Sequence, residues 1–456
     1  MNKKGNKMGT MSMGKLVTNV SVPLMISMLV QSLYNIIDGI FVSRISENAL
    51  TATSIAYPAQ MLMLAVAVGT GVGVNALLSR RLGQRDFEGV NKVATIGLAL
   101  ALVCSCVFVA AGIAGSRAFI DAFAENEKIA LYGTQYLRIC MIGCAGIFLA
   151  TTGERLLQST GNTFLSMVAQ TAGALVNIIL DPILIFGLLG LPEMGIRGAA
   201  VATVVGQFAA AAVSLGLNAV KNKEIHFQIK NFRMDGAIVR EIYKVGVPTM
   251  LMQTMGSIMM VCMNAYLVVF SSTAVAAFGV YYKLWTFVYM PVSGLSQGLI
   301  PIIGFNYGAK NGERVMRAYK ITAAASAGTM LAGTLLFELF PGQLLSLYDA
   351  GEQMIEIGIP LLRIMALTFP LAAVTITIGF ACSGLGNGMV SMVGTLLRQL
   401  VLLVPFARLF GDLWGIDRVW YAAWISETAA AVFAVVCFIG QYRKKIRPIM
   451  RCENVR

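Results

Sequence analysis

The sequence predicts an all-α membrane protein in which about twelve transmembrane helices form two pseudo-symmetric six-helix lobes. Of its 456 residues, 57% are hydrophobic and only 12% are charged, about half the charged fraction of a typical soluble protein. Apolar runs of about 20 residues, the length of a helix that crosses a bilayer, recur from one end of the chain to the other. Landmarks of the first half also recur in the second half in the same order.

Each apolar run is expected to be a helix, because a spanning segment must satisfy its own backbone polar groups in the hydrocarbon core. The first run is too long for a signal peptide and lacks an A-x-A-like cleavage site, so we expect it to stay in the chain. The predicted helices lie near residues 16–43, 49–78, 90–113, 130–152, 163–189, 196–219, 242–270, 274–304, 321–340, 357–382, 389–411 and 418–440.

The formal net charge of +13 is distributed as a topology signal and not as a nucleic-acid-binding surface. When the connections between helices are assigned alternately to the two sides, 25 lysines and arginines fall on the side of the N-terminus and 5 on the other side. Cytoplasmic loops carry such an excess of basic residues. We therefore expect a multi-pass protein of the cell membrane with both termini cytoplasmic and with no nucleic-acid partner.

Sliding the sequence along itself by one constant offset aligns the two halves. The matches include Pro23 with Pro248, Gly83 with Gly308, Arg138 with Arg363, and Gly161 with Gly386. Each copy holds about six helices, an even number, so both copies have the same orientation, and substrate sites in such parallel repeats lie between the copies. The predicted domains are an N-terminal lobe at 1–220, a cytoplasmic linker at 221–241, and a C-terminal lobe with a basic tail at 242–456.

Two carboxylates lie deep in apolar runs of the first half. Asp38 is in the first run and Asp181 in the fifth, where Asn177 lies one turn earlier on the same helical face. Thr203 of the sixth run reaches a similar depth. A carboxylate in hydrocarbon costs about 2.5 kcal/mol or more and normally faces the bundle interior. We expect these four side chains to converge on a site for a proton or Na⁺. The alternatives are a structural hydrogen-bond network and, for Asp38, a position among the lipid headgroups.

Five further residues are candidates for the lining of a substrate cavity: Tyr34, Gln253, Tyr282, Lys283 and Glu427. Lys283 and Glu427 either form a buried ion pair or line the cavity. The rings of Tyr34 and Tyr282 can stack on flat or cationic ligands. Aromatic residues near helix ends are, however, more often anchors at the membrane interface.

The sequence motifs argue against an enzyme. The stretch 294–298 fits G-x-S-x-G, but it lies in an apolar helix with no preceding strand, and close helix packing by small residues explains it. No G-x-x-x-x-G-K-[ST] sequence is present, which excludes transport driven by an ATPase in this chain. We expect no catalytic residue, no cofactor, no disulfide and no metal site, apart from Na⁺ at Asp38 and Asp181.

Several segments together resemble the multidrug and toxic compound extrusion (MATE) antiporters over essentially the whole chain. They are PLMISMLVQSLYNIIDGIFVSR, LGQRD, LQSTGN, LVNIILDPILIF and PVSGLSQGLIPIIGFNYGAKN. The resemblance implies two six-helix lobes around a cavity that opens alternately to each side. It also implies a cation site at Asp38, Asn177, Asp181 and Thr203, and a first helix that bends at Pro23. Where some branches carry acids in the seventh and tenth helices, this chain has Gln253 and Ser383, so it looks closer to the bacterial DinF-like branch.

The predicted function is that of a secondary active efflux antiporter. The resemblance implies that it exports cationic, amphipathic drugs or toxic organic cations in exchange for H⁺ or Na⁺. Its other partner would be the lipid bilayer, and we expect it to function as a monomer. The alternative is a flippase for a lipid-linked sugar precursor, which would need several basic residues in its cavity, where we find Lys283 and Arg398. A membrane scaffold would give no reason for two buried acids.

Overall fold

A computed structural model describes residues 6–227, 233–348 and 351–453, and the regular secondary structure of these residues is helical. Within the described part, ten helices are long and apolar enough to cross a membrane. The number rises to twelve if each of two bent helix pairs is one span. The predicted fold class is therefore confirmed.

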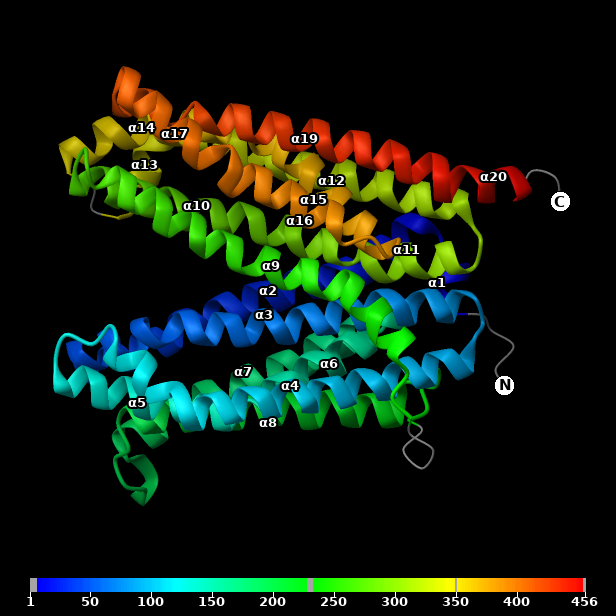
Figure 1. Cartoon of the computed structure of the whole chain (residues 1–456), viewed down its shortest axis with the longest axis horizontal. Helices are drawn as coiled ribbons and strands as arrows, with labels where there is room; N and C mark the ends of the chain where they lie inside the picture. Colours follow the sequence, from blue (N-terminus) through cyan, green and yellow to red (C-terminus); the bar gives the residue numbers. More distant parts are fainter. Residues whose placement is uncertain (1–5, 228–232, 349–350, 454–456) are drawn as a thin grey trace.

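The first half of the chain forms one bundle, drawn in blue to green in the lower part of Figure 1. After the short helix α1 (Lys7–Thr10), its spans are α2 to α8, with the 3₁₀ turn η1 (Leu188–Gly190) before the last. They are α2 (Met13–Ser43), α3 (Glu47–Gly83), α4 (Phe87–Asp121), α5 (Glu127–Ile142), α6 (Ala145–Ser159), α7 (Thr163–Phe186) and α8 (Ile196–Lys221).

The second half forms the other bundle, green to red in Figure 1, and both termini lie at the same end of the molecule, which we call the terminal end. Its helices are α9 (Gly236–Leu267), α10 (Ser272–Gln297), α11 (Leu299–Gly308), α12 (Gly312–Leu339), α13 (Pro341–Ser346), α14 (Glu352–Ala366), α15 (Phe369–Gly384), α16 (Met389–Leu396), η2 (Leu397–Val401), α17 (Leu403–Trp414), α18 (Ile416–Val419), α19 (Ala422–Gln441), η3 (Tyr442–Ile446) and α20 (Arg447–Glu453).

Several helices begin before the apolar runs that predict them, because polar side chains cap their first turns. Asp86 accepts a hydrogen bond from the Gly89 amide at 2.9 Å at the start of α4. Asp235 accepts one from the Ala237 amide at 2.8 Å, so α9 begins within the predicted linker at 221–241. Part of that linker, 228–232, lies outside the described residues. The runs predicted at 130–152 and 357–382 are pairs bent by 46° and 48°.

The backbone repeats at the same offset as the sequence. Gly161 and Gly386 have φ values of +83° and +78°, and Arg85 and Lys310 have φ values of +61° and +57°. A positive φ at Arg85 and Lys310 is unusual, because only glycine adopts it without strain. The bend between α14 and α15 in the second copy also lies at nearly the same position of the repeat as the bend between α5 and α6 in the first copy. The two bundles are thus copies in backbone conformation as well as in sequence.

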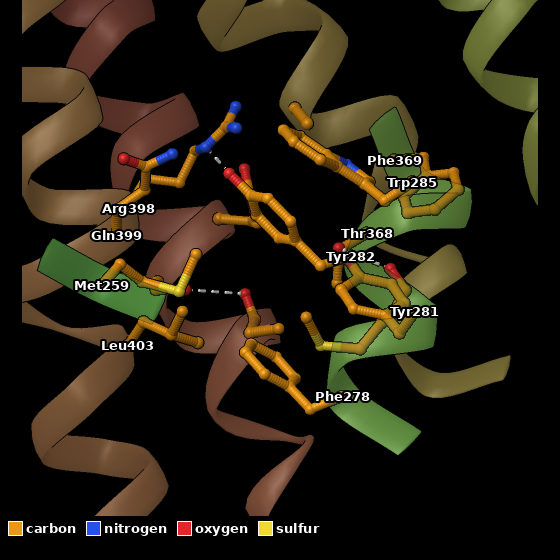
Figure 2. A pocket seen from close by; sticks show the side chains of 15 residues that line it. Met259, Phe278, Tyr281, Tyr282, Trp285, Thr368, Phe369, Arg398, Gln399 and Leu403 are labelled. Carbon is orange, nitrogen blue, oxygen red and sulfur yellow. Dashed lines mark hydrogen bonds and ion pairs between the residues drawn. The ribbon is translucent and has the colours of Figure 1, made fainter. Parts of the chain in front are cut away.

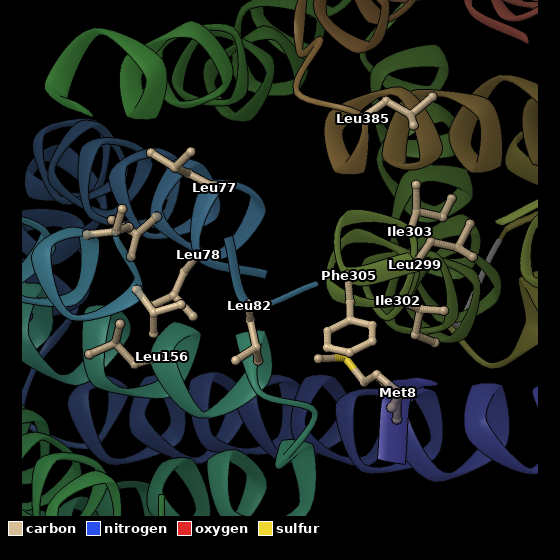
Figure 3. Packing of buried hydrophobic residues seen from close by; sticks show 14 of the residues in the cluster. Met8, Leu77, Leu78, Leu82, Leu156, Leu299, Ile302, Ile303, Phe305 and Leu385 are labelled. Atoms are coloured by element: carbon tan, nitrogen blue, oxygen red, sulfur yellow. The ribbon is translucent and has the colours of Figure 1, made fainter. Parts of the chain in front are cut away.

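The bundles pack against each other at the terminal end, where α3 contacts α9 and α11 and α2 contacts α10. Figure 3 shows Met8, Leu82 and Phe305 meeting there in one buried hydrophobic cluster. A Cβ atom at Gly83 would collide with the Phe305 carbonyl, and one at Gly308 would collide with the Arg80 carbonyl. These two contacts are related by the repeat, so both copies need glycine at the same place.

The N-terminal segment connects the two bundles at this end. The Arg314 guanidinium of α12 donates to the carbonyls of Met8 at 3.0 Å and Met11 at 2.7 Å. On the other side, the Asn6 amide donates to the Glu224 carboxylate at 2.7 Å. The Met8 side chain is fully buried between these contacts. The segment therefore helps to close the terminal end.

Candidate functional site

Three of the four predicted cation-site residues meet between α7 and α8. The Asn177 amide donates to Asp181 Oδ1 and to Thr203 Oγ1, both at 3.4 Å. Their exposed fractions are 2% for Asn177, 0% for Asp181 and 7% for Thr203. The helices approach closely because a Cβ at Gly206 would lie 2.8 Å from the Gly173 carbonyl. Small residues at the α7–α8 contact thus bring the three polar side chains together.

Asp38 faces this group from α2, which packs against α7. It lies within electrostatic range of Asp181, but no hydrogen bond or ion pair joins it to the other three among the described residues. One oxygen of each of Asp38, Asp181 and Asn177 is buried without a hydrogen-bond partner. A buried polar atom without a partner costs about 1–3 kcal/mol, more for a charged group. Three such oxygens in one region are typical of a site for a proton or a cation.

Two tyrosines and a cysteine lie near Asp38, and the sequence alone indicated only one of them. Tyr34, which was predicted, lies within electrostatic range of Asp38 and Asp181. Tyr136 and Cys140 of α5 are buried and lie near the same carboxylate. The only sequence feature that relates Tyr136 to Cys140 is their spacing of one helical turn. Such a spacing identifies a shared helix face but not what that face packs against.

A cavity of about 1200 Å³ lies beside this site, enclosed mainly by helices of the first bundle. Asn177 and Thr203 line it, so the polar site borders the cavity directly. Tyr34 also lines it, and Gln253 of α9 reaches it from the second bundle. Six glutamines contribute to its wall: Gln31, Gln158, Gln170, Gln207, Gln253 and Gln297. The wall is therefore rich in neutral groups that can donate and accept hydrogen bonds.

Two adjacent charged residues of α6, Glu154 and Arg155, line the same cavity. Arg155 Nη1 donates to Gln158 Oε1 and to Gln297 Oε1, both at 2.9 Å, so it links the two bundles. The Glu154 carboxylate has no hydrogen bond or ion pair within the described part of the chain. The sequence alone did not single out this pair, because both residues lie just beyond the fourth predicted run at 130–152.

The second bundle encloses a cavity of about 520 Å³, shown in Figure 2. Arg398 and Glu427 form an ion pair in its wall with Nε and Oε1 3.2 Å apart. The Arg398 guanidinium also lies 5.9 Å from the centre of the Trp285 ring, a distance typical of a cation–π contact. Arg398 sits in the π-helical turn η2, and such turns are common at functional sites.

Lys283 does not pair with Glu427 and lines neither cavity, so both alternatives that the sequence left open for this lysine are wrong. Tyr282 and Lys283 are neighbours on α10 and point to different sides of it. Tyr282 lines the cavity, whereas the Lys283 side chain is exposed and its Nζ lies 5.7 Å from the centre of the Tyr348 ring. Arg398, and not the lysine, pairs with Glu427.

Pro23 is buried within the continuous helix α2 and lies between two contacts with α10. Ser21 Oγ donates to the Leu295 carbonyl at 3.0 Å. One turn later, a Cβ at Gly294 would lie 2.9 Å from the backbone of Met25. The glycines of the G-x-S-x-G stretch therefore provide close contact between the lobes beside Pro23.

Comparison with known proteins identifies the family. The sequence model of the MatE family matches residues 23–183 and 247–409, which is most of the chain. The chain belongs to the MatE family. It is 24% identical over 432 residues to the multidrug export protein MepA of Staphylococcus haemolyticus, covering 93% of each chain. It is 27% identical over 406 residues to an FAD transporter of Shewanella oneidensis, covering 87% of this chain and 88% of the relative.

A solved structure of a multidrug resistance MATE family transporter of the MOP superfamily, in an outward-facing conformation, has the same fold. Its TM-score is 0.89 at 28% sequence identity, with 99% of this chain and 100% of the other covered. The resemblance to MATE proteins is therefore confirmed. As a MatE family member, the chain is a multi-pass membrane transporter and not an enzyme.

Proposed function

We propose that this MatE family protein exports cationic, amphipathic drugs in exchange for H⁺ or Na⁺. One observation carries the proposal: Asp38, Asp181 and Asn177 each hold a buried oxygen without a hydrogen-bond partner, and Asn177 also lines the large cavity. Asn177 belongs to both the polar site and the cavity wall. A bound compound and a bound cation would therefore compete for the same place, which is what an exchange mechanism requires.

The donor set suits either coupling ion. Two carboxylates can take up a proton, and carboxylate, amide and hydroxyl oxygens are the hard ligands that bind an alkali cation. Asp38, Asn177, Asp181 and Thr203 together supply those groups. No further cofactor is needed for such an exchange, because the ion gradient across the cell membrane supplies the free energy.

Glu154 gives the cavity an acid that can attract a cationic compound, and Tyr34 supplies an aromatic face for it. The relative named a multidrug export protein supports drugs as the exported compounds. In the second lobe, Gln253 adds to the same wall, and Tyr282 and Glu427 line a separate smaller cavity.

The terminal end is the cytoplasmic end in this proposal, in agreement with the distribution of basic residues. The contacts between the lobes at that end then close the protein toward the cytoplasm. Binding of the cation at Asp38 and Asp181 would favour a different packing of α2 near Pro23. A ligand shifts such an equilibrium only by its difference in affinity for the two states.

Efflux of ethidium from proteoliposomes, under an imposed pH gradient or an imposed Na⁺ gradient, tests the proposal. We expect one gradient to drive efflux by the wild type, and Asp38→Asn and Asp181→Asn to abolish it. Asp417→Asn is the matched control, because Asp417 is exposed and lies in the second lobe, outside the site. Wild-type rates in both site variants would overturn the mechanism.

The flippase for a lipid-linked sugar remains the alternative, and the same liposomes separate it. The large cavity has a single arginine, Arg155, next to the acid Glu154, so its wall offers little net positive charge to a diphosphate. Ethidium efflux with no movement of a fluorescent lipid-linked precursor would support the antiporter. Movement of the precursor without ethidium efflux would support the flippase.

A further inference from the structure

A third cavity, of about 530 Å³, lies between the lobes at the terminal end. The first lobe contributes Arg80 at the end of α3. The second lobe contributes Glu241 and Lys244 of α9, Gly386 after α15, and Lys445 of η3. We call it the terminal-end cavity. It shares no lining residue with the large cavity, and the transport mechanism above makes no use of its residues.

The terminal-end cavity carries uncompensated positive charge. Of its three basic residues, Arg80 forms an ion pair with Glu241. Lys445 donates to the neutral carbonyl of Leu385 at 2.8 Å. Lys244 has no hydrogen bond or ion pair among the described residues. Lys244 and Lys445, which line the same cavity, therefore have no carboxylate to balance their positive charges.

The backbone of the cavity wall brings these groups toward one point. Gly386 adopts a φ of +78° in the turn between α15 and α16, and a Cβ there would lie 3.1 Å from Arg80 Nη1. Its repeat equivalent, Gly161, is covered in the first lobe by Lys7 and Met8 of the N-terminal segment. The same turn is thus covered by the chain itself in one lobe and borders the basic cavity in the other.

We infer that the terminal-end cavity binds a phosphate group, carried either by an anionic lipid headgroup or by free inorganic phosphate. The Arg80 guanidinium offers its planar fork and the two lysines offer point charges, which is the combination that phosphate oxygens favour. Basic recesses between helices on the cytoplasmic side are suited to anionic headgroups.

A phosphate held there would contact α3 of the first lobe and α9 and η3 of the second. It would therefore stabilise the state in which the terminal end is closed, because separating the lobes would pull its ligands apart. The effect on the equilibrium equals the difference in phosphate affinity between the two states.

The test is binding to the purified full-length protein, which does not depend on transport. One arm titrates inorganic phosphate against chloride at matched ionic strength by calorimetry. The other arm measures retention of phosphatidylglycerol against phosphatidylcholine by native mass spectrometry. We expect Lys244→Gln and Lys445→Gln each to weaken binding about fivefold, as expected for the loss of one charge contact. Lys244→Gln leaves no broken partner, so its folding should be unaffected.

Arg240→Gln and Lys444→Gln are matched controls, because both residues are exposed neighbours outside the cavity wall. We expect them to bind like the wild type. Phosphate binding without lipid selectivity would identify the free anion, and selective retention of phosphatidylglycerol would identify the headgroup. Absence of both, or equal losses in the cavity variants and their controls, would overturn the inference.

Discussion

At the scale of single residues, Asn177 is the centre of the N-lobe site, because its amide donates to both Asp181 and Thr203. Helical spacing alone places Asn177 and Asp181 on one face, so the sequence indicates that pair. The approach of Thr203 depends on how α7 packs against α8, and the depth of each residue in its apolar run gave only a coarse guide. Their role in cation binding is a prediction that the experiments below address.

Thr203→Val should weaken cation coupling without disturbing the fold. The change keeps the side-chain shape and removes the hydroxyl that accepts from Asn177, at a cost of about 1 kcal/mol, or roughly fivefold in affinity. We expect the cation concentration for half-maximal ethidium efflux to rise by about that factor. Thr329→Val is the control, because the Thr329 hydroxyl bonds only to its own helix, at the Ala325 carbonyl. Equal shifts in the two variants would argue against a role for Thr203.

Glu154→Gln should reduce the affinity for cationic compounds more than for neutral ones. The carboxylate lines the large cavity without a partner in the described residues, and its loss should weaken ethidium binding by about twofold to fivefold. Fluorescence titration of the purified protein with ethidium measures this, and a neutral dye of similar size provides the comparison. Glu313→Gln changes the same charge at an exposed position and should leave both affinities unchanged.

The sequence did not reveal Glu154 as a cavity residue, for a physical reason. Glu154 and Arg155 lie just beyond the fourth predicted apolar run, and Arg155 alone reads as one more basic residue of the topology signal. Only packing turns both side chains toward a common space, since Arg155 is held by Gln297 from the other lobe. The contact of Arg398 with Glu427 was missed in the same way, because it depends on how one helix packs against the next.

At the scale of helices, the contact between α3 and α11 is controlled by two glycines. The repeat aligns Gly83 with Gly308, and the structure shows that each packs on a backbone carbonyl of the other lobe. The sequence indicated that these positions are equivalent but not that they take part in the contact between the lobes. The repeat aligns positions along the chain, whereas the packing of side chains determines how one lobe is oriented on the other. Helix ends were also misjudged by several residues, since polar caps and not apolar residues set them.

Gly83→Ala should destabilise closure of the terminal end. The added methyl collides with the Phe305 carbonyl, and overpacking of this kind costs about 1–3 kcal/mol. Spin labels at Glu88 and Glu313, which are exposed and equivalent in the repeat, would report the separation of the lobes by electron spin resonance. We expect a larger population at long distance than in the unsubstituted labelled protein.

Gly328→Ala is the control for that experiment, because a Cβ at Gly328 meets no atom within 4 Å. It should leave the distance distribution unchanged, and alanine in an open helical position should not lower stability. An unchanged distribution in Gly83→Ala would show that this contact does not govern closure.

At the scale of the whole molecule, the fold could be predicted almost completely from the sequence. Long apolar runs must become helices in a bilayer, and the repeat that pairs Gly161 with Gly386 in the sequence reappears in their positive φ values. The cavities could not be predicted in the same way, because their walls combine residues from many helices. The large cavity, for example, takes Gln253 and Gln297 from the second lobe.

The central claim is that the exported compound and the coupling ion share one site in the first lobe. Ion release on addition of ethidium to the purified protein measures this directly, because coupling between two ligands is reciprocal. Protons are followed in weakly buffered solution and Na⁺ as a radiolabel. We predict release of one of these ions from the wild type and none from Asp181→Asn, although the variant still binds ethidium. Binding of ethidium to the wild type without release of either ion would contradict the account.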